Sequence, residues 1–411
     1  MNYIDLFAGA GGLSEGFIRN GFVPVAHVEM NKFAAQTLKT RMAYHYLKEV
    51  NRLDIYYAYI SGKISSKEFY SHIPLNIQET VINREISNET IKEIFNDIEK
   101  NMARIGCKNI DVIVGGPPCQ AYSLVGRARD PYNKEHDPRN YLYRQYVKFL
   151  VKFSPRLFVF ENVPGILTAA KGRLFEDVKR YMNEAGYDID AKILDASDFG
   201  VLQQRKRVIL IGWQKGLNYK YPQFQKIEHT YKVNDLLSDL PKLKPGEKIH
   251  FGSYTSDPTE YVEKFGIRKS SDILTQHITR IHNERDREIY RLTIQLWNKE
   301  KRRLKYHELP KELRTHKNLH SFLDRFKVVG AEEPYSHTMV AHIAKDGHYY
   351  IHPDINQLRS LSVREAARIQ SFPDNYFFEG SRTAAFNQIG NAVPPIMAEL
   401  IAKEIKKMMS E

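Results

Sequence analysis

Cysteine is scarce in this chain, with two residues among 411. Two cysteines exclude a disulfide framework. The sequence has neither a C-x-x-C pair nor a cysteine–histidine pair at zinc spacing, so no metal site is expected. It also lacks a run of about 20 apolar residues that could span a membrane and a basic, apolar leader segment. These absences predict a cytoplasmic protein, and its 42% hydrophobic content is ample for a large core.

Acidic residues are too few to balance the basic ones, which leaves a net charge of +12. The stretch 264–330 holds 17 Lys and Arg against 8 Asp and Glu, and it includes "NKEKRRLKYH" at 298–307. An ordinary basic surface is one interpretation. The clustering favours a polyanionic partner instead, and nucleic acid is the partner that we expect.

Short apolar runs alternate with amphipathic stretches over the first 215 residues. This alternation predicts an α/β fold with a doubly wound, mostly parallel sheet, whose ligands bind at the carboxyl ends of the strands. Residues 50–80 resemble an insertion, and the alternation stops near Gly216, where a polar, basic second domain is expected. The expected strands are 3–7, 23–29, 111–116, 157–162, 189–195 and 207–213, and the expected helices are 13–20, 31–46, 88–105, 140–153, 173–185, 362–372 and 395–409.

A glycine-rich stretch, "DLFAGAGGLSEGF" (5–17), joins the first expected strand to a helix. Glycines let a ligand approach the backbone, and a helix N-terminus offers free N–H groups. The order Gly9-x-Gly11-Gly12 does not fit the dinucleotide fingerprint. Glu29, at the end of the second strand, suits a ribose with both hydroxyls free. A nucleoside-containing cofactor is therefore expected, although a ligand-free turn, with Glu29 beside a helix cap at Asn31, is the alternative.

Reactive side chains follow the next two expected strands. Cys119 lies in "GGPPCQAYS" (115–123), where prolines fix the backbone, so it is a candidate nucleophile rather than a structural cysteine. Glu161 of "ENV" closes an apolar strand. Burial there would raise its pKa and make it a proton donor, unless a neighbouring arginine or backbone N–H groups simply hold it.

Two arginines precede the last strand of the first domain. Arg205 and Arg207 in "QQRKRV" (203–208) are two positions apart, so an extended backbone places them on one face. Two guanidinium groups at this edge suit a phosphate and a base carbonyl. A solvated basic turn is the alternative.

Taken in order, the motifs resemble those of the DNA (cytosine-5)-methyltransferase family. The resemblance spans residues 5 to 395 and implies a Rossmann-like catalytic domain (1–214 plus 377–411) and a smaller target recognition domain (215–376). It further implies duplex DNA as partner, a monomer, a prokaryotic cytoplasm and a restriction–modification role with a possible cognate endonuclease encoded nearby. The motifs are "DLFAGAGG", Glu29, "GGPPCQAYS", "ENV", "QQRKR", "RSLSVREAARIQSFPD" (359–374) and "QIGNAVPP" (388–395).

The resemblance also implies roles for single residues. The Cys119 thiolate would add to carbon 6 of a flipped-out cytosine, with Glu161 at N3 and Arg207 at O2, while Arg205 would support the thiolate and a phosphate. The stretch 121–140 would be a loop that closes over the base, with Gln120, Ser123 and Arg127 at the DNA.

The implied cofactor is S-adenosylmethionine, which would leave as S-adenosylhomocysteine. Glu29 would hold its ribose and Met30 would lie against its adenine. Glu85 stands where the family has aspartate, which leaves that match open. The residues expected around the cofactor are Phe7, Gly9, Gly11, Gly12, Leu13, Glu29, Met30, Glu85, Ile86, Gly116, Pro118, Leu142, Asn391, Ala392 and Val393.

Two other functions compete with this interpretation. A tRNA cytosine methyltransferase shares the catalytic set, but the "CFT" tripeptide usual in such proteins is missing and the basic variable region is long. A catalytically dead DNA-binding relative would have lost the cysteine, the glutamate or the glycine loop. A dinucleotide-dependent dehydrogenase fails on the glycine spacing. The segment "HYYIH" (348–352) could suggest a metal ligand set, but a plain strand is expected there.

Overall fold

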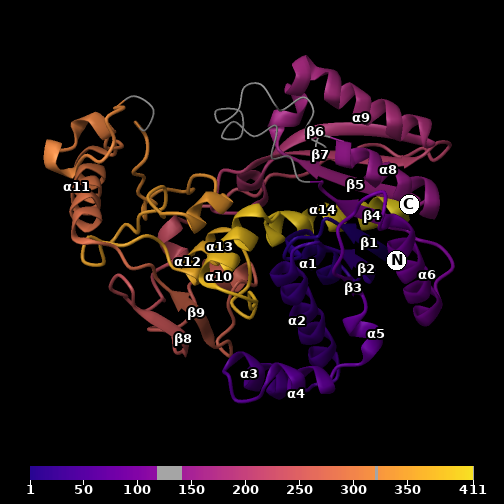
Figure 1. Ribbon diagram of the computed structural model, residues 1–411, viewed down its shortest axis with the longest axis horizontal. Coiled ribbons are helices and arrows are strands. Elements are labelled where there is room, and N and C mark those ends of the chain that lie inside the picture. Colours follow the sequence, from indigo (N-terminus) through magenta and orange to yellow (C-terminus); the bar gives the residue numbers. More distant parts are fainter. Residues whose placement is uncertain (118–140, 320–322, 411) are drawn as a thin grey trace.

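A seven-stranded sheet forms one half of the protein (Figure 1) in the order β3-β2-β1-β4-β5-β7-β6. The computed structural model describes residues 1–117, 141–319 and 323–410. Strands β3, β2, β1, β4 and β5 run parallel, and β7 runs antiparallel to β5 and β6. The strands are β1 (Asn2–Leu6), β2 (Val23–Val28), β3 (Val81–Ile82), β4 (Val112–Gly115), β5 (Leu157–Asn162), β6 (Tyr187–Asp195) and β7 (Lys206–Gln214).

The expected α/β fold is confirmed, and one strand was missed. β3 is only two residues long, too short for a period-2 pattern to reveal it. The other six strands lie within two residues of their expected bounds at every end.

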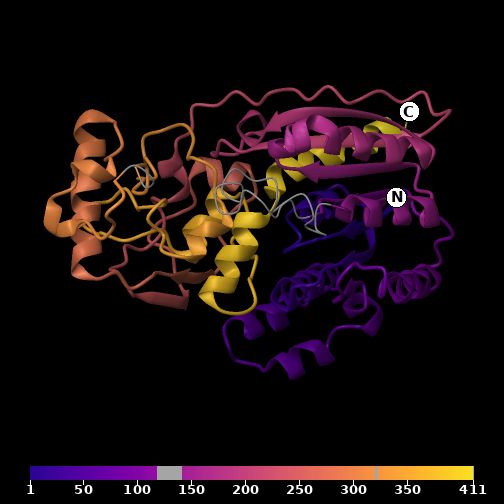
Figure 2. The same cartoon turned by 45° about the horizontal axis from the view of Figure 1, so that its top comes forward.

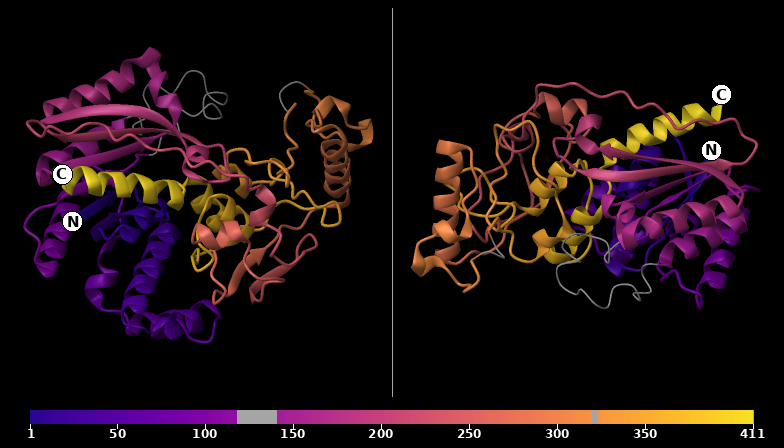
Figure 3. Two further views of the ribbon diagram at one scale, coloured as in Figure 1. Left: turned by 180° about the vertical axis from the view of Figure 1, so that it is seen from behind. Right: turned by 90° about the horizontal axis from the view of Figure 1, so that it is seen from above.

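Helices cover both faces of the sheet (Figures 1 and 3). One face packs against α1, α2 and α14, and the other against α6, α8 and α9. Gly16 allows α1 and α14 to approach closely, since a Cβ there would lie 2.3 Å from the main chain of Ala398. These helices are α1 (Gly12–Arg19), α2 (Lys32–Glu49), α6 (Ile91–Ile105), α8 (Leu142–Phe153), α9 (Arg173–Glu184) and α14 (Pro395–Ser410).

The strand order reverses direction between β1 and β4. At such a switch point the connections leave the sheet on opposite faces, which opens a crevice at the carboxyl ends of the strands. Leu6 and Gly115 end the two strands side by side. The glycine loop and the "GGPP" segment therefore start at the same place, which is where the sequence predicted a ligand.

The chain leaves the sheet after β7 and forms a separate region that is far from the termini in Figure 2. A core around α11, with Tyr290, Phe326 and Ile351, belongs to this region alone. Residues such as Val233 and Val329 join the core of the sheet instead, so the boundaries at 215 and 376 stay a prediction. The elements are β8 (Lys248–Gly252), α10 (Glu260–Lys264), β9 (Leu274–Ile278) and α11 (Glu284–Glu300).

The prediction of a strand at 348–352 was wrong. His348 and Tyr349 lie in a turn, and only Ile351 forms isolated bridges, to Val328 and Ser360. The segment 50–80 folds instead into three short helices, α3 (Leu53–Ile60), α4 (Ser66–Ser71) and α5 (Leu75–Gln78).

The motif at 359–374 is buried together with its charges. Within it, Arg359 pairs with Glu365 at 2.7 Å and Arg368 pairs with Asp374 at 2.6 Å, with all four side chains at 1% exposure or less. These pairs fix α12 (Val363–Ile369) before the chain returns to the sheet through α13 (Arg382–Asn391).

No helix in the described part of the chain is both long and apolar enough to cross a membrane. No group of three or more His, Cys, Asp or Glu side chains there could hold a metal ion.

Candidate active site

The glycine loop after β1 is tightly folded against the start of α1 and the segment after α13. Gly9 and Gly11 have φ values of 55° and 82°, in the left-handed region that favours glycine. A Cβ on Gly12 would lie 2.2 Å from the carbonyl oxygen of Val393. The loop therefore touches the "QIGNAVPP" segment, so two motifs that are far apart in the sequence form one wall.

Glu29 links this loop to the end of β2. Its carboxylate accepts hydrogen bonds from the backbone N–H of Gly9 at 2.8 Å and of Asn31 at 2.6 Å. Burial raises the pKa of Glu29, partly offset by these hydrogen bonds. Asn31 caps α2, accepting from the backbone N–H groups of Phe33 and Ala34. Glu29 therefore lies beside the helix cap Asn31, as the alternative of a ligand-free turn predicted. Its carboxylate also faces the glycine loop.

The backbone of the glycine loop borders open space at Gly9. A Cβ placed on Gly9 would meet no atom within 4 Å, so the loop backbone borders open space. Met30 next to it is 61% exposed, which leaves an apolar side chain available for a flat ring. Phe7 adopts a φ of 57° at the end of β1. These residues could hold the adenosine part of the expected cofactor.

The end of β3 lies beside the same place and contributes a residue that sequence reasoning missed. The Asn83 side-chain amide donates to the carbonyl oxygens of Glu29 at 2.8 Å and Met30 at 3.1 Å. Ile86 is buried and Glu85 is exposed. No motif in the sequence pointed to Asn83, because its role depends on β3.

Glu161 and Arg207 meet at the next strand ends. The Arg207 Nε lies 2.6 Å from the Glu161 Oε1, with the side chains 10% and 16% exposed. A Cβ on Gly116 would lie 2.6 Å from the Glu161 Oε2, so the backbone after β4 touches this carboxylate. The sequence expected these groups together, including the possibility that an arginine holds the glutamate.

Asn162 connects β5 to the backbone that precedes the predicted nucleophile. This buried side chain donates to the carbonyl oxygen of Pro117 at 3.2 Å and accepts from the backbone N–H of Val163 at 2.9 Å. Its place in the "ENV" motif was the available signal, although no role was assigned to it. The contact ties the Glu161 strand to the chain immediately before Pro118.

Several predicted residues lie outside the described residues. They are Pro118, Cys119, Gln120, Ser123 and Arg127, and their roles stay predictions. Leu142, at the start of α8, is described and is half-buried.

Arg205 is buried rather than presented at the surface. It is 1% exposed, and its guanidinium donates to the carbonyl oxygens of Met339, Gly390 and Ala392. Burial, together with the charge on Arg207, holds the pKa of Arg205 well below its usual value. The predicted contacts with the thiolate and a phosphate stay predictions, and the structure offers a different role.

The other predicted cofactor residues line one wall. Leu13 is buried behind the glycine loop, and Ala392 and Val393 are buried beside it. Asn391, the last residue of α13, is exposed. The structure therefore brings the first and last motifs together.

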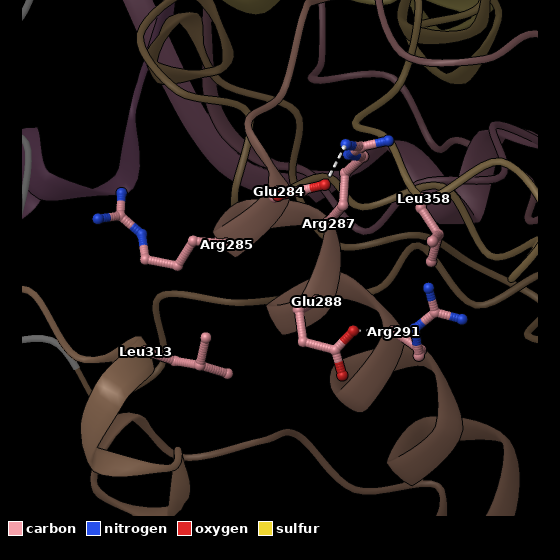
Figure 4. Close-up of a pocket in the computed structure, with 7 residues that line it drawn as sticks. All are labelled: Glu284, Arg285, Arg287, Glu288, Arg291, Leu313 and Leu358. Atoms are coloured by element: carbon pink, nitrogen blue, oxygen red, sulfur yellow. Dashed lines mark hydrogen bonds and ion pairs between the residues drawn. The ribbon is translucent and has the colours of Figure 1, made fainter.

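A surface hollow of about 490 Å³ lies elsewhere, at the first turns of α11 (Figure 4). Arg287 and Arg291 each lie near a glutamate of the preceding turn, at 3.8 Å and 3.0 Å. Because these charges are compensated, the hollow does not resemble an anion site. Its lining residues are Glu284, Arg285, Arg287, Glu288, Arg291, Leu313 and Leu358.

Comparisons with known proteins agree with the motifs. The sequence model described as C-5 cytosine-specific DNA methylase matches residues 1–69 and 76–407. A type II methyltransferase of Bacillus paralicheniformis is 43% identical, covering 100% of this chain and 99% of the relative. A type II methyltransferase of Desulfomicrobium norvegicum is 30% identical, covering 98% and 88%. A crystal structure described as a prophage-encoded DNA modification methyltransferase (E. coli) has a TM-score of 0.67 at 25% identity, with 100% of both chains covered.

Proposed function

We propose that this protein methylates a cytosine that is flipped out of a specific duplex sequence. The chain belongs to the C-5 cytosine-specific DNA methylase family and is therefore a DNA (cytosine-5)-methyltransferase. The observation that carries the proposal is the Glu161–Arg207 pair beside Gly116, at the strand ends where the crevice opens. Two relatives named as type II methyltransferases support a protective role in a restriction–modification system, with a cognate endonuclease as possible partner.

The chemistry needs a nucleophile, because carbon 5 of cytosine is a poor nucleophile itself. In our proposal the Cys119 thiolate forms a bond to carbon 6, and the electron pair of the ring double bond becomes available at carbon 5. Glu161 hydrogen-bonds N3 and relieves the charge that develops there, while Arg207 holds O2. When bound, S-adenosylmethionine supplies the methyl group. Loss of the carbon 5 proton to a base then allows the thiolate to leave and restores the ring.

The ion pair in the present structure has a clear meaning in this scheme. The Glu161 carboxylate and the Arg207 guanidinium form an ion pair at 2.6 Å. A flipped cytosine would insert its N3 and O2 edge between them. The Glu161 carboxylate would take up a proton from solvent and donate it in a hydrogen bond to N3, while Arg207 would donate to O2. The pair would therefore keep both side chains in place until the base enters.

The cofactor would lie in the crevice between Gly9 and Met30. Glu29 would accept from its ribose hydroxyls, since this carboxylate already faces the loop through the N–H of Gly9. Ala392 and Val393 would close the wall behind Gly12. The basic stretch 264–330 would neutralise DNA phosphates, and the domain at 215–376 would read the bases.

Two glycine substitutions test the cofactor wall. Gly9→Ala adds a methyl group into open space at positive φ, so we expect a loss of about 1 kcal/mol in stability but more than tenfold weaker cofactor binding. Gly12→Ala forces a Cβ against the Val393 carbonyl and should cost about 1–3 kcal/mol through overpacking, with cofactor binding lost as well. Calorimetric titration with S-adenosylmethionine and thermal unfolding separate the two effects. Unchanged cofactor affinity in Gly9→Ala would place the cofactor elsewhere.

The activity itself is tested with labelled S-adenosylmethionine and either duplex DNA or tRNA. We expect transfer to DNA alone, and Glu161→Gln should lower kcat by about 10²–10⁴-fold, because the amide cannot give a proton to N3. Glu184→Gln, on the exposed end of α9, is the matched control and should keep full activity.

Each competing function predicts a different result in this assay. Transfer to tRNA but not to DNA would support the tRNA methyltransferase alternative. DNA binding without any transfer would support the catalytically dead relative. Bisulfite sequencing of plasmid DNA from expressing cells then identifies the recognition sequence and the methylated base.

A further inference from the structure

The segment Gln203–Arg205, just before β7, contacts three distant parts of the chain. Gln203 donates to the side-chain oxygen of Gln370 at 2.6 Å and accepts from the backbone N–H of Met339 at 2.7 Å. Arg205 donates to the carbonyl oxygens of Gly390 at 3.1 Å, Ala392 at 2.9 Å and Met339. The segment is therefore a buried junction rather than a surface turn.

Two of the carbonyl groups that Arg205 binds, those of Gly390 and Ala392, lie at the end of α13. The last carbonyls of a helix have no partner within the helix, and a cation near them is favoured by the helix dipole. Ala392 receives a second buried donor, the side-chain amide of Gln370 at 2.6 Å. Two side chains thus converge on the main chain that immediately precedes Val393, whose carbonyl packs against Gly12.

The third carbonyl belongs to a segment that comes from the recognition side. Met339 lies between Ser336, which pairs with Gln203, and a 3-10 turn at Ala341–Ala344. This turn packs directly on α13, since a Cβ on Gly390 would lie 2.2 Å from the backbone nitrogen of Ala341. One guanidinium therefore joins the 336–344 segment to the end of α13.

Arg205 differs from the other fully buried arginines. Arg359 and Arg368 each have a carboxylate at 2.6–2.7 Å. Arg364 also donates to main-chain oxygens, but it has Asp374 at 3.8 Å. Arg205 has no ion-pair partner among the described residues. A buried cation is costly to desolvate. An arginine at this buried position therefore needs a compensating role. Arg205 binds three carbonyl groups from two separate segments, and only a planar side chain with several donors can do so.

We propose that Arg205 is a positioning residue that holds the Ala392–Val393 wall of the cofactor crevice and the 336–344 segment in a fixed relation, and that it does not contact DNA. The proposal rests on the proposed function, in which Ala392 and Val393 border the cofactor. It differs from the expectation that Arg205 binds a phosphate, because the guanidinium is directed to interior carbonyls and the side chain is 1% exposed.

The decisive variant is Arg205→Lys, which keeps the charge but cannot serve three carbonyls at once. We expect S-adenosylmethionine to bind about tenfold more weakly in calorimetry without DNA. The dependence of the DNA dissociation constant on salt should keep its slope. A lost phosphate contact would do the reverse, lowering that slope by about one and leaving cofactor affinity unchanged. That reverse result would overturn the proposal.

Two further variants make the test specific. Arg207→Lys is the matched comparison, and it should lower kcat while cofactor affinity stays at the parent value. Gln370→Leu removes the second donor to Ala392 and should weaken cofactor binding about threefold, with kcat at saturating cofactor preserved. If Arg205→Lys does not fold, Gln370→Leu decides, and parent-like cofactor affinity in that variant contradicts the proposal. Failure of the parent protein to bind S-adenosylmethionine would instead contradict the proposed function.

Discussion

Replacing Cys119 by serine is expected to abolish methyl transfer, with a loss of at least about 10⁴-fold in kcat. A hydroxyl is far less ionised than a thiol near neutral pH and adds poorly to carbon 6 of the base. S-adenosylmethionine affinity should stay at the parent value, because the residues that border the crevice, such as Gly9 and Glu29, are untouched. The measurement is transfer of labelled methyl to duplex DNA, together with calorimetric cofactor binding.

The chain supplies its own control for this variant. Cys107 is the other cysteine, located two residues after α6, and burial raises the pKa of its thiol. Cys107→Ser removes a sulfur atom away from the strand ends and should retain full activity. Substantial transfer by Cys119→Ser, or an equal loss in both serine variants, would show that Cys119 is not the nucleophile.

Acidification below pH 6.5 is expected to destabilise the fold steeply, because three histidines are buried without charge. His27, His282 and His352 are each 6% exposed or less, and burial lowers the pKa of all three to about 3. In the unfolded chain their pKa returns to about 6.5. The unfolded state therefore binds protons first as the pH falls, so the stability present above pH 6.5 is lost progressively toward pH 3.

The expected slope is large enough to measure. Each histidine contributes up to about 1.4 kcal/mol per pH unit between roughly pH 6 and pH 4, or about 4 kcal/mol per unit for the three. Urea unfolding from pH 7.5 to pH 4.5 gives the slope, and His282→Gln should reduce it by about 1.4 kcal/mol per unit. The exposed His72, replaced in the same way, controls for the removal of a histidine as such. A flat profile in the parent protein would contradict buried neutral histidines.

Local patterns were enough to predict most of the sheet and its edge. The apolar runs that became β1, β2, β4, β5, β6 and β7 are long enough for their periodicity to be visible. Parallel strands end at a common edge, so the sequence could also place the glycine loop, Glu29 and Glu161 together. β3 escaped because two residues carry no pattern, and Asn83 escaped with it.

The second region resisted prediction for a different reason. Its packing depends on contacts between distant segments, such as Ile351 with Tyr290 and Phe326 around α11. A strand was expected at 348–352, yet among the described residues no neighbouring strand pairs along this segment beyond isolated bridges at Ile351. A helix was expected at 362–372, but nothing in the sequence indicated that Arg359 and Arg368 are buried with matching carboxylates.

By itself the sequence determined the chemistry that is available: a thiol behind two prolines, a carboxylate closing an apolar strand, and two arginines near a third strand end. Residue identity and spacing carry that information because reactivity resides in single side chains. Only the tertiary structure decided which of the two arginines meets the carboxylate. Arg207 lies 2.6 Å from Glu161, whereas Arg205 is directed to the carbonyls of Gly390 and Ala392. Two positions on an extended chain share a face, but the partners around that face come from segments almost 190 residues away, and no local pattern encodes where they pack.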